Sequence, residues 1–241
     1  MQPASHRRAI RWRVFPVGAC DTDHEMGMTQ RRVLILYGTS YGHTQKVAEY
    51  VRDGLEASGV VVTLLDGDRW REAGAPGGYN GVVLAASLIR GGHQRCIERY
   101  ARTYSLALSD MPSAFLSMSA SAASSDDEGR ADARREMDRF LDGTGWVPRI
   151  AETVAGAISY TRYDPFTRWM MRRICRKAGG PTDVTRDHEL TDWRQVARIA
   201  EGFAALVYGN ERERARERQQ PRIMGGRKFT GEGEVGLGGS A

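Results

Sequence analysis

Residues 31–44 of this chain read RRVLILYGTSYGHT, and the rest of the sequence is interpreted from this stretch. Residues 33–37 are a short apolar run, which predicts a buried β-strand. The run ends in a loop of small polar residues at 38–44, and a helical pattern begins directly after it. Backbone N–H groups, hydroxyls and the helix dipole all favour negative charge at such a junction. The stretch therefore predicts a phosphate site.

Strands and helices alternate along the remainder of the chain. Apolar, β-branched runs predict further strands at residues 60–65, 81–86, 112–119 and 150–158. Apolar residues at helical spacing predict helices at residues 47–58, 97–108, 126–141 and 193–207, with Thr191 or Asp192 capping the last one. The pattern predicts an α/β fold with a doubly wound, five-stranded parallel sheet of order 2-1-3-4-5.

The overall composition limits the class of protein. The chain has 241 residues, 41% of them hydrophobic, and a net charge of +5. No apolar run approaches the roughly 20 residues of a spanning helix, and the three cysteines lack the spacing of a zinc site or a disulfide framework. We therefore expect a cytoplasmic protein without a metal site. Its domain should span residues 31–208, with disordered segments at residues 1–30 and 209–241.

Three loops should meet at one edge of this sheet, because ligands of doubly wound folds bind at the carboxyl ends of the strands where the strand order reverses. These loops are residues 38–44, 87–93 and 117–125. The first loop lacks the pattern G-x-G-x-x-G and has no lysine before Thr44, so it matches neither the dinucleotide fingerprint nor the P-loop. A phosphate held by neutral donors is typical of flavin mononucleotide (FMN), which we expect as the cofactor.

The candidate cofactor residues lie on these three loops. Thr39 and Thr44 are expected to donate hydroxyls to the phosphate, although residues in such a turn can instead act as helix caps. His43 should start the helix with its side chain at the rim of the site, and His93 should be a surface histidine. The full set is Thr39, Ser40, Tyr41, Gly42, His43, Thr44, Ser87, Leu88, Ile89, Arg90, Ser117, Ser119, Ala120 and Ser121.

The sequence resembles a known family over roughly residues 31–207. Thr39-Ser40-Tyr41-Gly42-His43-Thr44 is similar to the flavodoxin phosphate loop T-x-T-G-x-T, with Tyr41 where a threonine is usual. Further segments resemble the flavodoxin-like, menaquinone-dependent protoporphyrinogen dehydrogenases of bacterial haem synthesis. These segments are residues 86–93, 111–115, 155–163 and 179–183, followed by Thr191-Asp192-Trp193. The run 155–193 is the most specific part, because ordinary flavodoxins lack it.

The resemblance implies an enzyme that binds FMN, oxidises protoporphyrinogen IX to protoporphyrin IX and passes the electrons to menaquinone or another quinone. The alternative is a flavodoxin-like electron carrier, or a quinone reductase with another substrate. The second loop offers no aromatic side chain to stack on the flavin, and Tyr41, Tyr160 or Tyr163 could do so. A flavin carries the redox chemistry itself, so the protein mainly binds and orients it. The candidate catalytic residues are Arg90, Arg162 and Tyr163.

Residues 159–187 do not fit the alternation and form an insertion after the fifth strand. Asp164-Pro165 predicts a helix start, followed on one side of the helix by Phe166, Trp169, Met170 and Ile174. Residues 162–177 contain six basic residues and one acidic residue, a local charge of +5. A basic helix with such a face is typical of a segment that lies on a membrane, here residues 163–178 on the inner face of the cell membrane. It also suits a lid over a planar, anionic substrate.

The alternative for this helix is a segment packed on the domain with its arginines in solvent. The basic charge of the chain could also indicate a nucleic-acid partner. We expect none, because its aromatic residues are not interleaved with arginines on a sheet.

Overall fold

A computed structural model of the chain describes residues 30–89, 91–177 and 179–219. Its central sheet has five parallel strands in the order β2-β1-β3-β5-β6. They are β1 (Arg32–Gly38), β2 (Val61–Asp66), β3 (Gly81–Ile89), β5 (Ser113–Ser119) and β6 (Ile150–Ala155). Numbered along the chain, these parallel strands read 2-1-3-4-5, so the predicted doubly wound order is confirmed.

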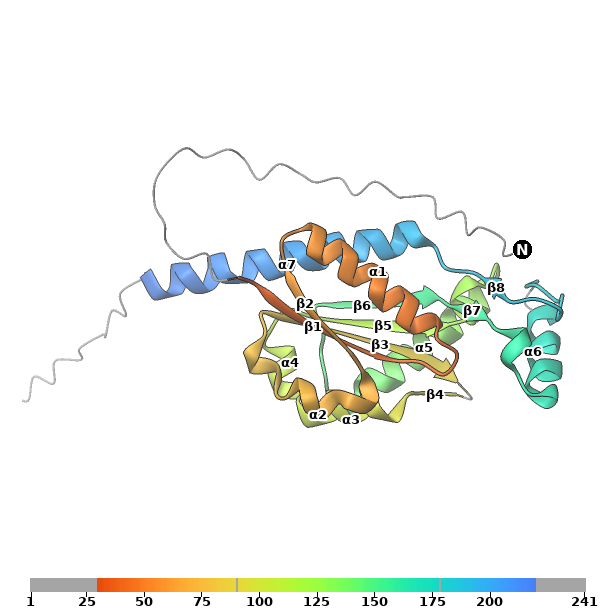
Figure 1. Cartoon of the computed structure of the whole chain (residues 1–241). Helices are drawn as coiled ribbons and strands as arrows, with labels where there is room; N and C mark the ends of the chain where they lie inside the picture. The colour runs from red at the N-terminus through yellow and green to blue at the C-terminus, as the bar shows by residue number, and fades with distance from the viewer. Residues whose placement is uncertain (1–29, 90, 178, 220–241) are drawn as a thin grey trace, which may run out of the picture.

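Helices cover both faces of this sheet (Figure 1). The α-helices are α1 (His43–Ala57), α2 (Trp70–Ala73), α3 (Arg95–Thr103), α4 (Ser105–Ser109), α5 (Asp127–Thr144), α6 (Pro165–Lys177) and α7 (Trp193–Gln219). Short 3₁₀ turns are η1 (Gly67–Arg69), η2 (Pro76–Gly78), η3 (Ser121–Ala123) and η4 (Tyr160–Arg162). Helices α1 and α7 pack on one face, and α3, α4 and α5 pack on the other.

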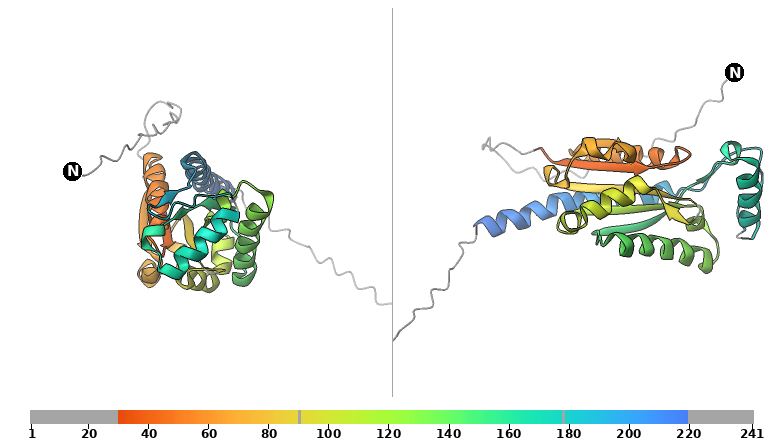
Figure 2. Two further views of the ribbon diagram at one scale, coloured as in Figure 1. Left: turned by 90° about the vertical axis from the view of Figure 1, so that its right-hand side faces the viewer. Right: turned by 90° about the horizontal axis from the view of Figure 1, so that it is seen from below.

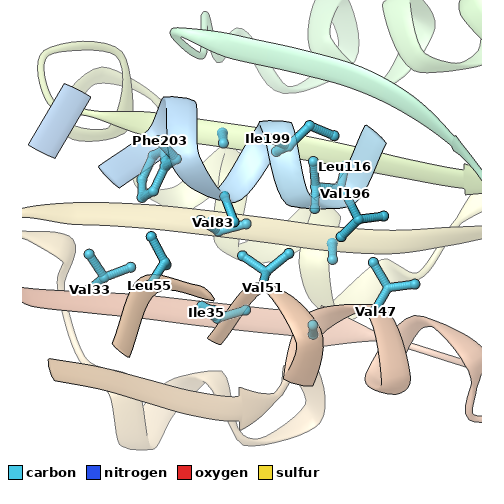
Figure 3. Close-up of a cluster of buried hydrophobic side chains, with 14 of the residues drawn as sticks. Val33, Ile35, Val47, Val51, Leu55, Val83, Leu116, Val196, Ile199 and Phe203 are labelled. Atoms are coloured by element: carbon cyan, nitrogen blue, oxygen red, sulfur yellow. The ribbon is translucent and has the colours of Figure 1, made fainter. Parts of the chain in front are cut away.

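The two faces have cores of different character. Under α1 and α7, the strands present β-branched and aliphatic side chains, and Figure 3 shows Val51 and Leu55 from α1 opposite Phe203 from α7. On the other face the largest fully buried side chains are aromatic and include Phe115, Tyr100 and Trp146. Burial on both faces explains why the strands read as continuous apolar runs.

The predicted fifth strand, residues 150–158, divides at Gly156 into β6 and the short β7 (Ala157–Ile158). Strand β7 pairs antiparallel with β8 (His188–Glu189). This two-stranded ladder closes the base of the insertion, so residues 159–187 leave and rejoin the domain at one point. Figure 2 shows α6 beyond the carboxyl ends of the strands. Another short strand, β4 (Gly92–His93), turns back against β3.

The last helix starts as predicted and ends later than predicted. Asp192 caps α7, because its Oδ1 accepts a hydrogen bond from the N–H of Arg194 at 2.9 Å. The helix continues to Gln219, so the disorder predicted from residue 209 is wrong as far as residue 219. Alternating arginine and glutamate have high helix propensity and extend a helix that has already started. The segments 1–29 and 220–241 lie outside the described residues. No helix in the described part of the chain could cross a membrane.

Candidate functional site

A pocket lies at the carboxyl ends of β1, β3 and β5, where all three predicted loops meet. The insertion forms its remaining wall. Ten predicted residues line it: Thr39, Tyr41, His43, Thr44, Ser87, Leu88, Ile89, Ser119, Ala120 and Tyr163. The structure therefore brings together segments as far apart in the sequence as Thr39 and Met171.

The loop at the start of α1 has the features of an anion site. Gly42 adopts a left-handed conformation with φ of 85° at the N-cap of α1, and no side chain caps the first turn. Thr39 closes the loop, because its Oγ1 accepts a hydrogen bond from the N–H of Gly42 at 2.9 Å. Thr44 is only 2% exposed and lines the pocket, and its hydroxyl forms no hydrogen bond with any described residue. The uncapped N–H groups and this hydroxyl fit a phosphate.

Gln94 joins the first loop to the second. Its Nε2 donates to the hydroxyl of Ser40 at 3.3 Å and also to the hydroxyl of Ser87. Ser40 therefore faces Gln94 and does not line the pocket. The same side chain explains Gly38, where a Cβ would lie 2.7 Å from the Cβ of Gln94. Sequence reasoning missed Gln94, because a lone glutamine carries no motif.

His93 is half-buried and packs against the domain, which differs from its prediction as a surface histidine. Its ring packs edge-on against Phe115 and Phe140, with centroids 5.3 and 5.0 Å away. Its Nε2 lies 2.8 Å from the hydroxyl of Ser117, and burial lowers the pKa of the imidazole to about 4. Ser117 is fully buried and faces His93, so it does not line the pocket. The pair fixes the β3–β4 hairpin to β5.

Ser119 is the polar residue of the third loop that faces the pocket. Its Oγ accepts hydrogen bonds from the hydroxyl of Ser121 and from the N–H of Ala122, both at 3.2 Å. Ser121 itself therefore supports Ser119 and is outside the pocket lining.

The insertion meets the first loop at Tyr41. The rings of Tyr41 and Tyr163 make an edge-to-face contact with centroids 4.9 Å apart. Burial raises the pKa of Tyr163, which keeps its hydroxyl protonated at neutral pH. Nη1 of Arg162 donates to the carbonyl oxygen of Tyr41 at 2.6 Å. Arg90 lies outside the described residues.

Among the three tyrosines that could stack on a flavin, Tyr41 and Tyr163 line the pocket. Tyr160 is fully buried, and its hydroxyl donates to the carbonyl of Pro181 at 2.9 Å. Tyr160 therefore serves the packing of the insertion and is not available to a ligand.

His43 begins α1 at the rim of the pocket, as predicted. Its Nε2 lies 2.7 Å from Oγ1 of Thr191, which in turn donates to the carbonyl of Ala155 at 2.7 Å. Burial lowers the pKa of His43, so the ring is neutral at neutral pH. Next to it, Lys46 forms an ion pair with Glu189 of β8. These contacts tie the start of α1 to the base of the insertion.

Helix α6 has two apolar sides, whereas the sequence pattern suggested one. Asp164 caps the helix as predicted, with Oδ1 accepting from the N–H groups of Phe166 and Thr167 at 3.1 and 3.0 Å. Thr167, Met170 and Met171 face the pocket, at the i, i+3 and i+4 spacing of one helical face. Phe166, Trp169 and Ile174 are 68%, 60% and 50% exposed. Met170 therefore lies on the pocket side of α6, whereas Phe166, Trp169 and Ile174, which were predicted to share its side, face outward.

Seven pocket residues were not among the predicted set. They are Met118, Gly156, Ala157, Ser159, Thr167, Met170 and Met171. The spacing of the last three could have identified them. The others required knowledge of where β5 and β6 end.

The pocket is suited to binding a flat, largely apolar ligand with an anionic tail. Its lining combines hydroxyls, methionines and tyrosines, and it contains no carboxylate. Within the described ranges, no group of three or more His, Cys, Asp or Glu side chains could hold a metal ion. The titratable groups of the described lining are His43, Tyr41 and Tyr163, whereas a redox cofactor would supply its own reactivity.

Comparison with known proteins gives the family. Residues 34–185 match the flavodoxin domain, which implies a flavin cofactor. The chain is 33% identical over 185 residues to a protoporphyrinogen IX dehydrogenase [quinone] of Leishmania major, covering 75% of this chain and 78% of that protein. It is 30% identical over 176 residues to the Escherichia coli K12 protein of the same name, covering 73% and 96%. This chain therefore belongs to the flavodoxin-domain family of protoporphyrinogen IX dehydrogenases (quinone).

Proposed function

We propose that this protein is an FMN-dependent oxidoreductase that converts protoporphyrinogen IX to protoporphyrin IX and delivers the electrons to a quinone. The observation that carries the proposal is a single pocket lined both by the phosphate loop and by the insertion. The family relationship supports the substrate and the acceptor, because both relatives are named for them.

FMN is the flavin that suits the first loop. Thr39, Thr44 and the uncapped first turn of α1 offer neutral donors at the amino end of a helix, which favours a terminal phosphate. Tyr41 and Tyr163 flank the loop and are the candidates to contact the isoalloxazine ring. When bound, the flavin would take up the hydrogen of the substrate and release electrons to the acceptor.

The insertion supplies the surface for a macrocyclic substrate. Met170 and Met171 offer polarizable thioethers to the pocket, and Tyr163 offers the edge of a ring. Such side chains suit a large apolar ring system. Arg162 and Tyr163 remain the candidate residues for orienting the substrate, since both contact Tyr41 of the phosphate loop and Tyr163 lines the pocket.

The outer side of α6 suits an anionic lipid surface, where a quinone acceptor would be found. Phe166 and Trp169 lie with ring centroids 6.3 Å apart and are exposed, as is Ile174. Arg172, Arg173 and Arg176 are exposed on the same helix and pair with no carboxylate among the described residues. Exposed aromatics flanked by arginines favour peripheral binding to the membrane.

Cofactor content and anaerobic turnover test the enzyme. Purified protein should be yellow, release FMN on denaturation and oxidise protoporphyrinogen IX when menaquinone is added. Complementation of a haem-auxotrophic strain that lacks its own protoporphyrinogen oxidase should succeed. Bound FMN without turnover or complementation would instead indicate an electron carrier or a quinone reductase with another substrate. A protein that binds no flavin would contradict the proposal.

Vesicle sedimentation tests the lipid surface. The doubly substituted protein Phe166→Ser/Trp169→Ser should bind phosphatidylglycerol vesicles roughly tenfold or more weakly than the wild type, because two apolar anchors are lost. Leu106→Ser is the matched control, since Leu106 is 80% exposed on α4, away from the insertion. Equal losses in both proteins would argue against α6 as the contact.

A further inference from the structure

The phosphate loop has no cation of its own. Residues 38–44 include neither lysine nor arginine. Lys46 follows in the first turn of α1, but its ammonium group pairs with Glu189. His43 is held neutral, because burial lowers its pKa. The loop and the helix dipole thus favour an anion without supplying a formal charge.

Arg162 brings a positive charge to this loop from the insertion. Its Nη1 donates to the carbonyl of Tyr41 at 2.6 Å, and a Cβ placed on Gly42 would lie 3.5 Å from the same nitrogen. The side chain is exposed and forms no ion pair with the described residues. Its remaining N–H donors are therefore free of carboxylates, next to the peptide that precedes α1.

The fold holds Arg162 in place before any ligand arrives. The neighbouring Thr161 donates from its N–H and its hydroxyl to Oδ1 of Asp187, at 2.9 and 2.8 Å. On the other side, Tyr163 is buried and packs against Tyr41. Both neighbours of Arg162 are thus fixed, which reduces the entropy cost of keeping its guanidinium on the loop.

An independent feature shows that this end of α1 is built for a ligand. The hydroxyl of Thr44 has no hydrogen-bond partner among the described residues, although the residue is 2% exposed and lines the pocket. A hydroxyl on the pocket wall that bonds to no protein group is available to donate to a ligand. Thr44 and the uncapped first turn thus face the pocket, and Arg162 holds the adjoining Tyr41 carbonyl from outside the lining.

We propose that Arg162 is a positioning residue for the phosphate of the cofactor. Its guanidinium holds the Tyr41–Gly42 peptide, and with it the amino end of α1, in the conformation that presents N–H groups to the phosphate. It also supplies the positive charge that the loop lacks. A hydrogen bond from a cation polarises the peptide group that accepts it. The N–H of this peptide belongs to Gly42 and donates to Oγ1 of Thr39, so the effect reaches the phosphate through the Thr39 hydroxyl. This inference rests on the proposed function, because it requires a phosphorylated flavin.

The test compares FMN with riboflavin, which lacks the phosphate. Dissociation constants of both flavins are measured by flavin fluorescence for the wild type, Arg162→Lys and Arg162→Gln. Arg162→Gln should weaken FMN binding about 10- to 100-fold, the range expected for hydrogen bonds to charged groups. Its riboflavin affinity should change by less than about threefold. Arg162→Lys keeps the charge and should retain most of the preference for FMN.

Arg168→Gln is the matched control. Arg168 also fixes the insertion through carbonyls, donating to Tyr160 and Tyr163 at 2.9 and 3.1 Å, but it does not touch the phosphate loop. Its substitution should leave the ratio of FMN to riboflavin affinity unchanged. An unchanged ratio in Arg162→Gln, or an equal change in Arg168→Gln, would overturn the inference while the proposed function stands. A wild type that binds neither flavin would overturn both.

Discussion

The half-buried histidine of the β3–β4 hairpin should make the protein sensitive to mild acid. His93 packs between Phe115 and Phe140, and its Nε2 lies 2.8 Å from the hydroxyl of Ser117. Desolvation lowers its pKa to about 4, and no charged side chain of the described residues contributes to this shift. The imidazolium form is therefore strongly disfavoured in the folded state, whereas in the unfolded chain it forms at the ordinary pKa of histidine.

The sign of the pH effect follows from these two pKa values. The ordinary pKa of histidine is about 6.5, so the unfolded chain takes up a proton as the pH falls through that value, and the folded protein does not until about pH 4. Stability from this group is complete above pH 6.5 and is lost between about 6.5 and 4. Between about pH 7.5 and 4.5 the loss amounts to roughly 2 to 3 kcal/mol.

Urea unfolding of the wild type and of His93→Gln over this pH range isolates the effect. Glutamine keeps a hydrogen-bonding group for Ser117 and does not titrate, whereas the carboxylates titrate equally in both proteins. As the pH falls, the wild type should lose roughly 2 to 3 kcal/mol more unfolding free energy than His93→Gln. A difference that stays constant with pH would refute the placement of His93 in an apolar site.

Five further substitutions, in three experiments, test other parts of the structure. Thr44→Val should weaken FMN binding by roughly tenfold or more in fluorescence titrations, because a hydroxyl donor to a charged phosphate is lost. The unfolding free energy of the ligand-free protein should not fall, and a fall would show that the hydroxyl has a protein partner. Gly38→Ala should cost about 1–3 kcal/mol in urea unfolding through overpacking, whereas Gly202→Ala, with open space around its Cβ, should be neutral or stabilising. Phe203→Ala should lower the unfolding free energy by about 3–5 kcal/mol. Phe166→Ala, at an exposed position, should lower it by less than about 0.5 kcal/mol. Similar losses for Phe203→Ala and Phe166→Ala would contradict the assignment of Phe203 to the core and Phe166 to the surface.

The sequence alone was sufficient for features that depend on neighbouring residues. Apolar runs and helical spacing identified the five parallel strands and their order, because burial on two faces leaves a continuous apolar signal. Asp164 was identified as a helix cap and Asp192 as one of two candidates with Thr191, because capping needs only a few consecutive residues. The loop at 38–44 was recognised in the same way, and the family followed from it and from the insertion.

Only the tertiary structure decided which side chains meet across the chain. Gln94 links Ser40 to Ser87, and His93 packs against aromatic residues of other elements. Contacts of this kind depend on how elements dock, which no local pattern encodes. The spacing of Thr167, Met170 and Met171 marks one side of α6, but only the tertiary structure shows that this side faces the pocket. Arg162 reaches a carbonyl 121 residues away, so its place beside the phosphate loop arises from packing of the insertion against the domain.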